Sequence, residues 1–553
     1  MKSKINIILL LIIVLSAFLR IWNLNKIPPG LTPDEAALGY NAYSILKTGR
    51  DEYGKFLPVI FKSFGDYKPG FYVYLTAPFV AVFGLNEWSV RLPSALSGVF
   101  SVFLLYLILY KLTNKKELGI WSAFLLAISP WHIQFSRGAW EVNVALTLTL
   151  LGIYYFLQSL TQIKYLKISV IAFAATLLTY QGAKLSTAIV VLCLCVAFYK
   201  EIIEIIKTDK IDVVKSLILG LLISTPIIFS IFTGAAGRLE VFSVFSYPRP
   251  RDYLQNFLDE GSEKYGTLSY YLFHSETLNF TRGVMGRWFN HLSGRFLFFE
   301  GDWANPRHTP PNHGTLLLFD LLLLPLGVMG LIRTNYKNIG KFILLWLLLA
   351  PLPAAMSRDA VQAVRSYNML VPFVIISAFG IVYLIEFVNT IKHPIFKIPL
   401  MFVVIAIFSA SFLYYLDSYL VHVPTHNAKY WEYGMKQIVQ TVSPIRNNYS
   451  QVIIQQSYAQ PYIYFLFYEK YDPKKYQDQA KLTNYLGPDV GLVDNLDNIA
   501  FSFFSWPIPL KTKTLVVGTP VVITSYNPND YNLIKDIKYP NGDVIYKVLE
   551  SKI

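Results

Sequence analysis

Two short polar clusters near the N-terminus carry side chains that can move a proton or hold a phosphate. Asp34 and Glu35 follow a first apolar run, and Asp66, Tyr67 and Lys68 lie further along the same stretch. A carboxylate at the edge of a membrane can accept a proton from a hydroxyl or amine nucleophile, and a lysine can bind phosphate as a point charge. The structural alternatives are helix capping by the two acids and a surface turn whose lysine reaches lipid head groups.

Further polar residues lie in short connections between later apolar runs. Arg137 and Glu141 have the i, i+4 spacing of a helical ion pair, although this charge order makes the pair weak. Otherwise Glu141 is a second acid facing the first cluster. Tyr180 and Lys184 stand in another connection, where the lysine adds a cation. Arg365 precedes a long apolar run, and we expect it to bind an anion, because a guanidinium matches two phosphate oxygens at once.

The segment 301–314 is dense in ionisable side chains, prolines and glycines directly before an apolar run. Asp302, Arg307, His308 and His313 together exceed what a structural turn requires. Arg307 and His308 are candidates for phosphate binding. Two histidines and an aspartate can also ligate a metal, but their spacing matches no zinc signature. We therefore expect no certain cofactor, and Asp302, His308 and His313 are the candidate ligands of a divalent metal.

The composition shows where these side chains must be positioned. Of the 553 residues, 54% are hydrophobic and only 15% are charged, and the mean hydropathy is +0.41. These values exclude an ordinary soluble protein and predict an integral membrane protein surrounded by lipids. The formal net charge of +14 does not predict nucleic-acid binding, because no basic block is interleaved with exposed aromatic residues in a soluble domain.

About eleven apolar runs are long enough to span a bilayer, the shorter ones with help from flanking aromatic and small residues. They lie approximately at 5–19, 92–109, 118–128, 142–157, 168–178, 185–198, 213–232, 316–332, 342–355, 367–385 and 398–416. No small-residue cleavage site follows the first run, which therefore predicts an uncleaved membrane helix.

Positive charges are unevenly divided between alternate connections, and this division predicts the topology. The lysine-rich connections belong on the cytoplasmic side by the positive-inside rule, together with the N-terminus. We therefore predict a transmembrane domain at 1–423, with outer loops at 23–91 and 233–313, and an extracytoplasmic α/β domain at 424–553. The lysine- and isoleucine-rich composition favours a prokaryotic cell membrane.

Local signals predict elements within the first outer loop and the tail. Thr32 can cap a helix over 36–48, with Pro33 in its first turn and Gly49 as its stop. The segment 71–83 predicts a helix lying along the membrane surface. In the tail, β-like runs at 452–454, 514–517, 521–525 and 544–548 alternate with turn signals.

These motifs, in this order and on one side of the membrane, resemble the GT-C superfamily of polyprenyl-phosphate-sugar-dependent glycosyltransferases. The most similar branch contains the protein O-mannosyltransferases and the lipid A aminoarabinose transferases. The resemblance rests on Asp34-Glu35, on Tyr67-Lys68-Pro69, which looks like the family's lysine–proline motif, and on Arg137 followed by Glu141. Gly70 stands where that motif often has a second proline, and Glu141 replaces an expected aspartate. The resemblance covers the predicted membrane domain and not the tail.

The resemblance implies an α-helical polytopic GT-C fold and transfer of a sugar from a polyprenyl phosphate, with inversion, to a lipid, glycan or protein acceptor. Asp34 is then the general base, and Glu35 or Glu141 orients the acceptor. Lys68, Arg137, His308 and Arg365 would stabilise the departing phosphate.

Three alternatives stay open. One is a ligase or polymerase that uses diphosphate-linked glycans, and another is a sugar-binding subunit with a decayed site. The third is a lipid or sugar transporter, which predicts ionisable residues near the middle of the bilayer. In this sequence the polar candidates gather at the outer ends of the runs instead.

Overall fold

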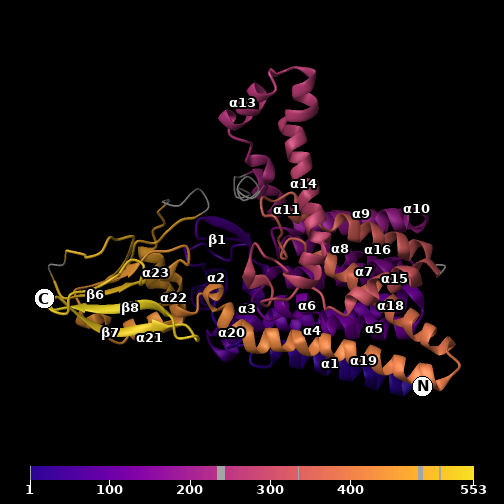
Figure 1. Ribbon diagram of the computed structural model, residues 1–553, viewed down its shortest axis with the longest axis horizontal. Helices are drawn as coiled ribbons and strands as arrows, with labels where there is room; N and C mark the ends of the chain where they lie inside the picture. Colours follow the sequence, from indigo (N-terminus) through magenta and orange to yellow (C-terminus); the bar gives the residue numbers. More distant parts are fainter. Residues whose placement is uncertain (1, 233–242, 334–335, 484–489, 510–511, 553) are drawn as a thin grey trace.

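The computed structural model describes residues 2–232, 243–333, 336–483, 490–509 and 512–552. The chain forms a helical bundle and a smaller sheet-containing domain, which follow one another along the longest axis (Figure 1). The N-terminus lies at the far end of the bundle and the C-terminus in the small domain. Below, the outer end of the bundle means the end that carries the C-terminal domain.

Every predicted apolar run falls on a helix of the bundle. Its helices are α1 (Lys2–Ile21), α4 (Glu87–Thr113), α5 (Lys116–Ile128), α6 (Pro130–Ser136), α7 (Glu141–Ser159), α8 (Leu166–Leu177), α9 (Ala183–Ala197), α10 (Tyr199–Thr208), α11 (Lys210–Phe232), α15 (Asp320–Arg333), α16 (Lys337–Leu349), α17 (Leu352–Ala355), α18 (Leu370–Thr390) and α19 (Pro394–Asp417). Their apolar composition and their packing against one another confirm the predicted polytopic helical class.

The lengths and compositions of the helices support fewer membrane spans than the eleven predicted from the sequence. Among the described residues, six helices are long and apolar enough to cross a membrane, and the pair α5 and α6, bent by 60°, makes a seventh. The helix within α1 and helix α9 are apolar but shorter. The predicted eleven spans are therefore all helical, but their number is not confirmed.

Burial separates the centre of the bundle from its rim. The apolar windows of α4, α7 and α18 are 67%, 72% and 67% buried, whereas that of the helix starting at Pro394 is only 6% buried. Exposed apolar side chains on a membrane helix face lipid, because hydrocarbon covers them at no cost. Helix α19 therefore lies on the rim, and α4, α7 and α18 form the centre.

The first outer loop folds as its local signals predict. Helix α2 (Pro33–Thr48) begins with a capping box, in which the Glu35 N–H donates to Thr32 Oγ1 at 3.2 Å and the Thr32 N–H donates to Glu35 Oε2 at 3.0 Å. Gly49 ends the helix in the left-handed region, with φ 69°. The predicted helix and both of its ends are thus confirmed.

A β-hairpin after α2 carries the lysine of the second cluster. Strands β1 (Ile60–Ser63) and β2 (Asp66–Pro69) are antiparallel, and Phe61 pairs with Lys68. Phe64 and Gly65 form the turn with φ of 53° and 92°, which suits the right-handed twist of a two-residue hairpin. Helix α3 (Phe71–Phe83) follows and packs against α2 and α4.

The C-terminal domain is a mixed sheet with short helices, as predicted. Within the described residues the strand order is β4-β5-β3-β6-β8-β7, and β3 is parallel to β5 and β6. The strands are β3 (Gln451–Gln455), β4 (Asn495–Leu496), β5 (Ile499–Ser502), β6 (Thr514–Gly518), β7 (Tyr531–Lys538) and β8 (Val544–Ser551), and the helices are α20 (Val423–His426), α21 (Gly434–Val442), α22 (Pro461–Tyr468) and α23 (Pro473–Gln479).

One predicted strand of this domain is wrong. The runs at 452–454, 514–517 and 544–548 lie in β3, β6 and β8, but 521–525 forms a turn and an irregular segment. The backbone carbonyl of Thr519 accepts hydrogen bonds from the N–H groups of Val522 and Ile523, and Val521 is 86% exposed. Tertiary context overrides the β preference of valine and isoleucine here.

The first outer loop joins the two parts of the molecule. Residues of α2 and α3 share one apolar core with α21, α22 and the sheet. The Tyr464 hydroxyl donates to the carbonyl of Leu31 at 3.0 Å, and the Tyr40 hydroxyl donates to that of Tyr471 at 3.2 Å. The loop is therefore held from both sides, which fixes Asp34 and Lys68 relative to the bundle.

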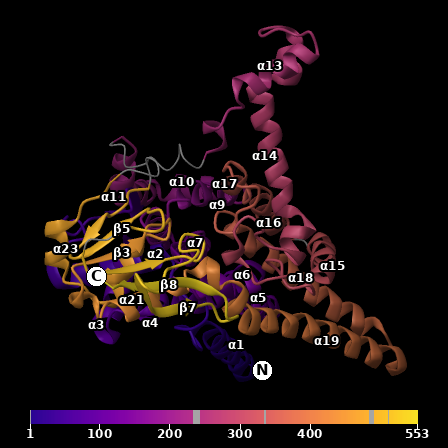
Figure 2. The same cartoon turned by 60° about the vertical axis from the view of Figure 1, so that its left-hand side comes forward.

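An arm projects sideways from the bundle. It contains α13 (Arg251–Glu260) and α14 (Glu276–Leu292), and it rises away from both parts of the molecule (Figures 1 and 2). Its base is continuous with the segment 301–314.

Candidate active site

A polar cavity of about 270 Å³ at the outer end of the bundle collects the predicted residues. Its wall is built by the first outer loop, the start of α7, the connection before α9, the segment 301–314 and the connection before α18. Seven of the predicted site residues line it, namely Asp34, Lys68, Glu141, Tyr180, Arg307, His308 and Arg365. Residues far apart in sequence therefore meet in one cavity.

Asp34 and Lys68 both line this cavity, and their side chains form an ion pair with each other. Lys68 Nζ donates to Asp34 Oδ1, and the side chain of Asp34 is 49% exposed while that of Lys68 is 11% exposed. Asp34 is the second residue of α2, where its charge also suits the positive end of the helix. Capping and a role in the cavity are thus compatible at this position.

Glu35 lies outside the cavity, which corrects its prediction as a residue that orients the acceptor. Its side chain is buried and accepts from Arg91 Nε at 2.9 Å and Arg91 Nη2 at 3.1 Å. It also accepts from the N–H groups of Thr32 and Ala139 at 3.0 Å and 2.9 Å. A carboxylate occupied in this way holds the loop together. Arg91 was missed by the sequence reasoning, although an arginine next to an apolar run is a usable signal.

Arg137 is likewise structural, and its predicted contact with phosphate is wrong for this arrangement. The guanidinium is buried and donates to the carbonyls of Leu19, Trp22 and Ile27 at 2.8, 2.8 and 3.0 Å. Leu19 lies in the last turn of α1, where helix geometry leaves carbonyls unsatisfied, and Trp22 and Ile27 follow the helix. The helical pair of Arg137 with Glu141 does not form, since Arg137 precedes the break at which α7 begins with Glu141.

Asp66, Tyr67 and Lys184 stand behind the cavity wall. Asp66 is buried in the hairpin, and Tyr67 is exposed on its other face. The Tyr67 carbonyl accepts from Gln181 Nε2 at 2.6 Å, and Lys184 Nζ donates to Gln181 Oε1 at 2.9 Å. Gln181 itself lines the cavity. Tyr67 and Lys184 therefore hold a lining amide that the sequence reasoning missed.

His308 and Asp302 form a buried pair beside the cavity. His308 Nδ1 donates to Asp302 Oδ2 at 2.7 Å, and Asp302 also accepts from the N–H groups of Ala363 and Asn305 at 2.7 Å and 3.0 Å. Burial lowers the pKa of His308 although Asp302 opposes that shift. Burial thus favours the neutral ring, and Nε2 has no hydrogen-bond partner among the described residues.

The predicted metal ligands do not come together. His313 Nδ1 donates to the carbonyl of Gly314 at 2.8 Å, and its ring packs against Tyr414 and Tyr415 rather than against His308. In the described ranges, no group of three or more histidine, cysteine, aspartate or glutamate side chains could hold a metal ion. The set Asp302, His308 and His313 is therefore not a metal site in this arrangement.

The connection before α18 supplies cations to the opposite wall. Arg365 Nη1 lies 3.3 Å from Asp359 Oδ2, so its guanidinium is already partly engaged by a carboxylate. Arg358 Nη1 donates to the Tyr247 hydroxyl at 3.2 Å. Both arginines line the cavity together with Arg307, although Arg358 was not among the predicted site residues.

The charges of the described lining residues do not cancel. The cations are Lys68, Arg307, Arg358 and Arg365, and the carboxylates are Asp34, Glu141 and Asp359. These lining groups alone carry one excess positive charge, and the carboxylate of Asp302 lies behind His308. The cavity therefore presents several cations to an anionic ligand.

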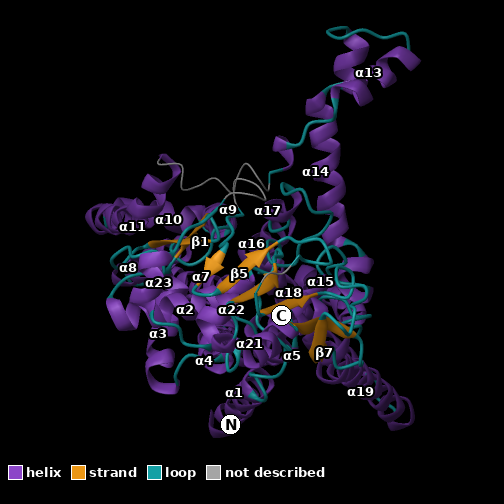
Figure 3. Cartoon of the chain, turned by 90° about the vertical axis from the view of Figure 1, so that its left-hand side faces the viewer, coloured by secondary structure: helices purple, strands orange, loops and turns teal. Residues whose placement is uncertain are grey.

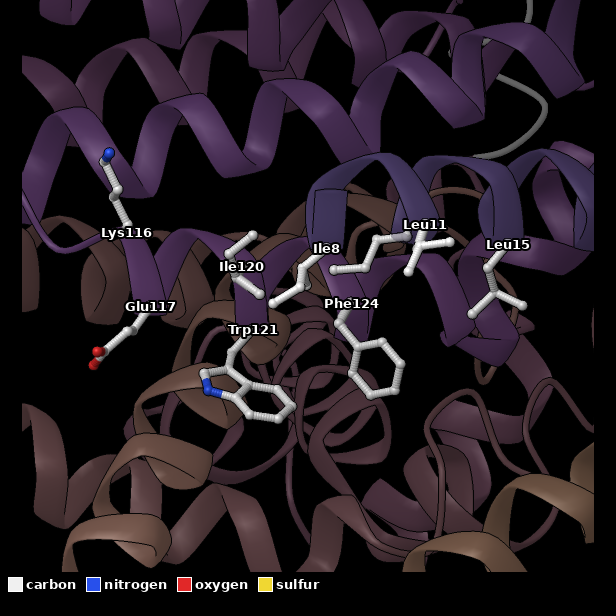
Figure 4. A pocket seen from close by; sticks show the side chains of 9 residues that line it. Ile8, Leu11, Leu15, Lys116, Glu117, Ile120, Trp121 and Phe124 are labelled. Atoms are coloured by element: carbon white, nitrogen blue, oxygen red, sulfur yellow. The ribbon is translucent and has the colours of Figure 1, made fainter. Parts of the chain in front are cut away.

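A second cavity is larger but has a different character. It measures about 480 Å³ and lies between α1 and α5, where Ile8, Leu11, Leu15 and Phe124 line it (Figure 4). Lys116 and Glu117 stand at one edge. Apolar walls of this kind suit hydrocarbon and do not provide groups for chemistry.

Comparison with known proteins agrees with this arrangement. Residues 67–229 match the family model described as dolichyl-phosphate-mannose-protein mannosyltransferase. This range runs from β2 to α11 and contains Lys68, Glu141 and Tyr180 of the cavity.

Two proteins of Bacillus subtilis (strain 168) are similar in sequence, the candidate mannosyltransferases YkcB and YycA. The first is 32% identical over 139 residues, which are 25% of this chain and 18% of YkcB. The second is 28% identical over 233 residues, which are 41% of this chain and 31% of YycA. The chain thus matches less than a third of the length of either relative.

Solved structures are similar over most of the chain. ArnT from Cupriavidus metallidurans, bound to undecaprenyl phosphate, matches with a TM-score of 0.53 and 10% identity over 98% of this chain and 97% of ArnT, and its apo state matches with 0.57. The oligosaccharyltransferase AglB from Archaeoglobus fulgidus, in complex with an inhibitory peptide and a dolichol-phosphate, gives 0.50 with 12% identity over 84% of this chain and 63% of AglB. The chain therefore shares the fold of ArnT and AglB, and the family model and the two relatives agree with the resemblance predicted from its sequence.

Proposed function

We propose that the protein transfers a sugar from a polyprenyl phosphate carrier to an acceptor hydroxyl or amine at the outer face of the membrane, with inversion. The observation that carries the proposal is the single cavity in which Asp34 and Glu141 face Lys68, Arg307 and Arg365. Acids for the acceptor and cations for a phosphate stand within the same space, as such a transfer requires.

The charge of the cavity supports a monophosphate-linked donor. A sugar linked to a polyprenyl phosphate is a phosphodiester with one negative charge, which balances the single excess positive charge of the lining. Undecaprenyl phosphate and dolichol-phosphate are bound by ArnT and AglB respectively. A diphosphate-linked glycan brings a second negative charge, for which the lining provides no further excess cation.

The ion pair of Lys68 with Asp34 couples donor binding to base activation. Without donor, Asp34 is held by Lys68. A phosphate between the two walls competes for Lys68 Nζ, because an ammonium group has three donors and binds phosphate strongly. Asp34 is then released toward the acceptor and can take its proton.

The reaction balances with these groups alone. The Asp34 carboxylate takes the proton of the acceptor O–H or N–H, and the acceptor atom bonds to the anomeric carbon. The bond from that carbon to the phosphate oxygen breaks, and its electron pair leaves with the polyprenyl phosphate. Lys68, Arg307 and Arg365 stabilise the second negative charge that develops there. Displacement from the face opposite the phosphate inverts the anomeric centre.

Glu141 and His308 are assigned to orientation. Glu141 lines the same cavity as Asp34 and can accept a hydrogen bond from the acceptor. His308 presents a lone pair at Nε2 because its Nδ1–H is committed to Asp302, so the neutral ring suits a sugar hydroxyl better than a phosphate oxygen. This differs from the phosphate contact that the sequence suggested.

The test is transfer from radiolabelled polyprenyl-phosphate-sugar by the purified protein in liposomes, with and without Asp34→Asn. We expect wild-type transfer to fall by roughly 10²–10⁴-fold in the variant, the range for loss of a general base, with thermal unfolding unchanged. Unaltered transfer by folded Asp34→Asn would overturn the proposal.

A parallel assay with the same sugar on a diphosphate carrier distinguishes the proposed transferase from a ligase or polymerase that uses diphosphate-linked glycans. We expect turnover of the monophosphate donor and not of the diphosphate donor. Exclusive use of the diphosphate donor would instead assign a ligase or polymerase.

A further inference from the structure

We infer that the arm formed by residues 249–292 is a membrane-surface anchor, which lies in the lipid leaflet on the side of the C-terminal domain and braces the cavity from there. The partner of this surface is lipid, at the level of the head groups and the adjoining acyl chains. The inference does not depend on the reaction proposed above.

The direction of the arm provides the first argument. In Figure 1 the helices α4, α5 and α19 run along the long axis of the molecule, whereas α14 rises across it. Figures 2 and 3 turn the molecule about the vertical axis, and α14 stays upright in both. If α4 and α19 cross the bilayer, α14 extends in the plane of the membrane and away from the bundle.

The attachment of the arm sets its depth. At its base, Arg287 Nε donates to the carbonyl of Ala355 at 2.7 Å and Trp288 Nε1 donates to that of Leu348 at 2.8 Å. Both carbonyls belong to the outer end of the α16–α17 segment, a candidate span that runs from Lys337 to Ala355. The arm therefore leaves the bundle where a span reaches the membrane surface.

The side chains at the tip are those of an interfacial segment. Leu268, Tyr271, Leu272 and Phe273 are 75%, 62%, 54% and 63% exposed. Tyrosine and phenylalanine beside leucine are typical of the membrane–water boundary, where an aromatic ring meets both phases. Left in water, such a cluster would be a continuous apolar patch.

The arm is a built structure and not a loose loop. Leu254 and Leu258 of α13 are buried within it. Arg249 Nε lies 2.8 Å from Glu276 Oε1, which ties the start of the arm to the first turn of α14. The exposed apolar residues are therefore additional to those that the arm needs for its own packing.

The base of the arm also contacts the wall of the cavity. His291, near the end of α14, accepts at Nε2 from the N–H of Gln362 at 2.9 Å. Gln362 lines the cavity, and α14 leads through the next residues to Asp302 and His308. An arm anchored in the leaflet thus fixes one wall of the cavity at a constant depth.

Site-specific fluorescence quenching tests the anchor. In full-length protein with Cys193 and Cys195 replaced by alanine, single cysteines at Leu268 and Phe273 are labelled with an environment-sensitive dye and reconstituted into liposomes that contain brominated phospholipids. Val521, which is 86% exposed in the C-terminal domain, is the matched control position. We expect quenching of at least about twofold at the arm positions and none at Val521.

Two results would overturn the inference. One is equal behaviour of the arm labels and the Val521 label, with both open to a water-soluble quencher. The other is protection of the arm labels from that quencher without quenching by brominated lipid, which would assign a protein partner or a second copy of this chain. A variant with Leu268→Glu, labelled at Phe273, should lose most of the lipid quenching while keeping its thermal unfolding temperature, since Leu268 is 75% exposed.

Discussion

Asp34 and Glu35 are neighbours in sequence but lie in two different regions of the molecule. Asp34 faces the polar cavity, half exposed, and forms an ion pair with Lys68 that a ligand can exchange. Glu35 points into the loop core, where Arg91 and two backbone N–H groups occupy its oxygens. An acid that is to move a proton must be able to change partners, and an acid that fixes a fold must not.

The buried pair of Glu35 with Arg91 and the half-exposed pair of Asp34 with Lys68 also differ in their contribution to stability. Breaking a buried pair by removing one partner costs about 3–5 kcal/mol, because a charge is left without compensation. A pair as exposed as that of Asp34 contributes only about 0–1 kcal/mol after solvent screening. The cavity can therefore rearrange on binding at little cost, while the loop that carries it stays rigid.

The largest effect is expected for Glu35→Gln. Because Arg91 stays buried without its countercharge, we expect the free energy of unfolding to fall by about 3–5 kcal/mol. Denaturant unfolding in detergent measures this. Asp34→Asn is the matched control and should change stability by less than about 1 kcal/mol. Equal destabilisation by the two substitutions would contradict the claim that Glu35 stabilises the fold and Asp34 does not.

The next effect concerns Lys68 and its role in holding a phosphate. Lys68→Met should reduce turnover of the polyprenyl-phosphate-sugar donor by roughly 10²–10³-fold, as for loss of one preorganised donor. Lys62→Met is the control, since Lys62 lies on the paired strand of the same hairpin and outside the cavity. The measurement is the turnover rate of both variants with the same donor. A similar loss of turnover in both would contradict a specific contact between Lys68 and the phosphate.

Arg137 and Arg365 extend the comparison to cations. Arg137→Gln leaves buried carbonyls unsatisfied, so we expect a loss of about 1–3 kcal/mol in unfolding free energy and normal donor affinity in the folded fraction. Arg365→Gln should leave stability nearly unchanged and weaken donor binding. Thermal unfolding and donor titration of the two variants should give opposite patterns. The same pattern in both would remove the distinction between cavity and loop core.

The smallest effect comes from Glu52, a third acid of the same loop. Burial raises its pKa to about 8, although the hydrogen bond from Asn41 opposes the shift. The folded protein therefore holds a proton between pH 4.5 and 8 that the unfolded chain has released, so this contribution to stability falls as pH rises through that window and levels off above it.

Glu52→Gln should remove this dependence, which amounts to at most about 1.4 kcal/mol per pH unit. Unfolding at pH 7 and pH 8 measures it. We expect the wild type to lose stability over this step relative to the variant. A wild type that gains stability relative to the variant would contradict the assignment.

Much of the fold could be predicted because local patterns determine it. Every predicted apolar run fell on a bundle helix, although α6 and α10 lay outside these runs. Thr32, Pro33 and Gly49 predicted both ends of α2. The number of spans could not be settled, because short helices such as α8 and α9 become spans only through their neighbours. The strand predicted at 521–525 failed for a similar reason, since tertiary context and not propensity decides a short β segment.

The site was predicted in part because residue type and membrane side limit the candidates. Asp34, Lys68, His308 and Arg365 do meet in one cavity. Sequence cannot tell which of two adjacent acids points into the cavity, and so Glu35 was placed there. It also cannot tell whether an arginine binds backbone carbonyls or a ligand, and so Arg137 was placed there as well. The partners that occupy them, Arg91 and the carbonyls after α1, become visible only in three dimensions.

An experimental structure with undecaprenyl phosphate bound tests the central claim most directly. The account predicts a phosphate in the polar cavity, with Lys68 Nζ within hydrogen-bond distance of its oxygens and no longer paired with Asp34, while Glu35 and Arg91 keep their contacts. A phosphate bound elsewhere, or a Lys68 that still holds Asp34 beside the bound phosphate, would contradict it.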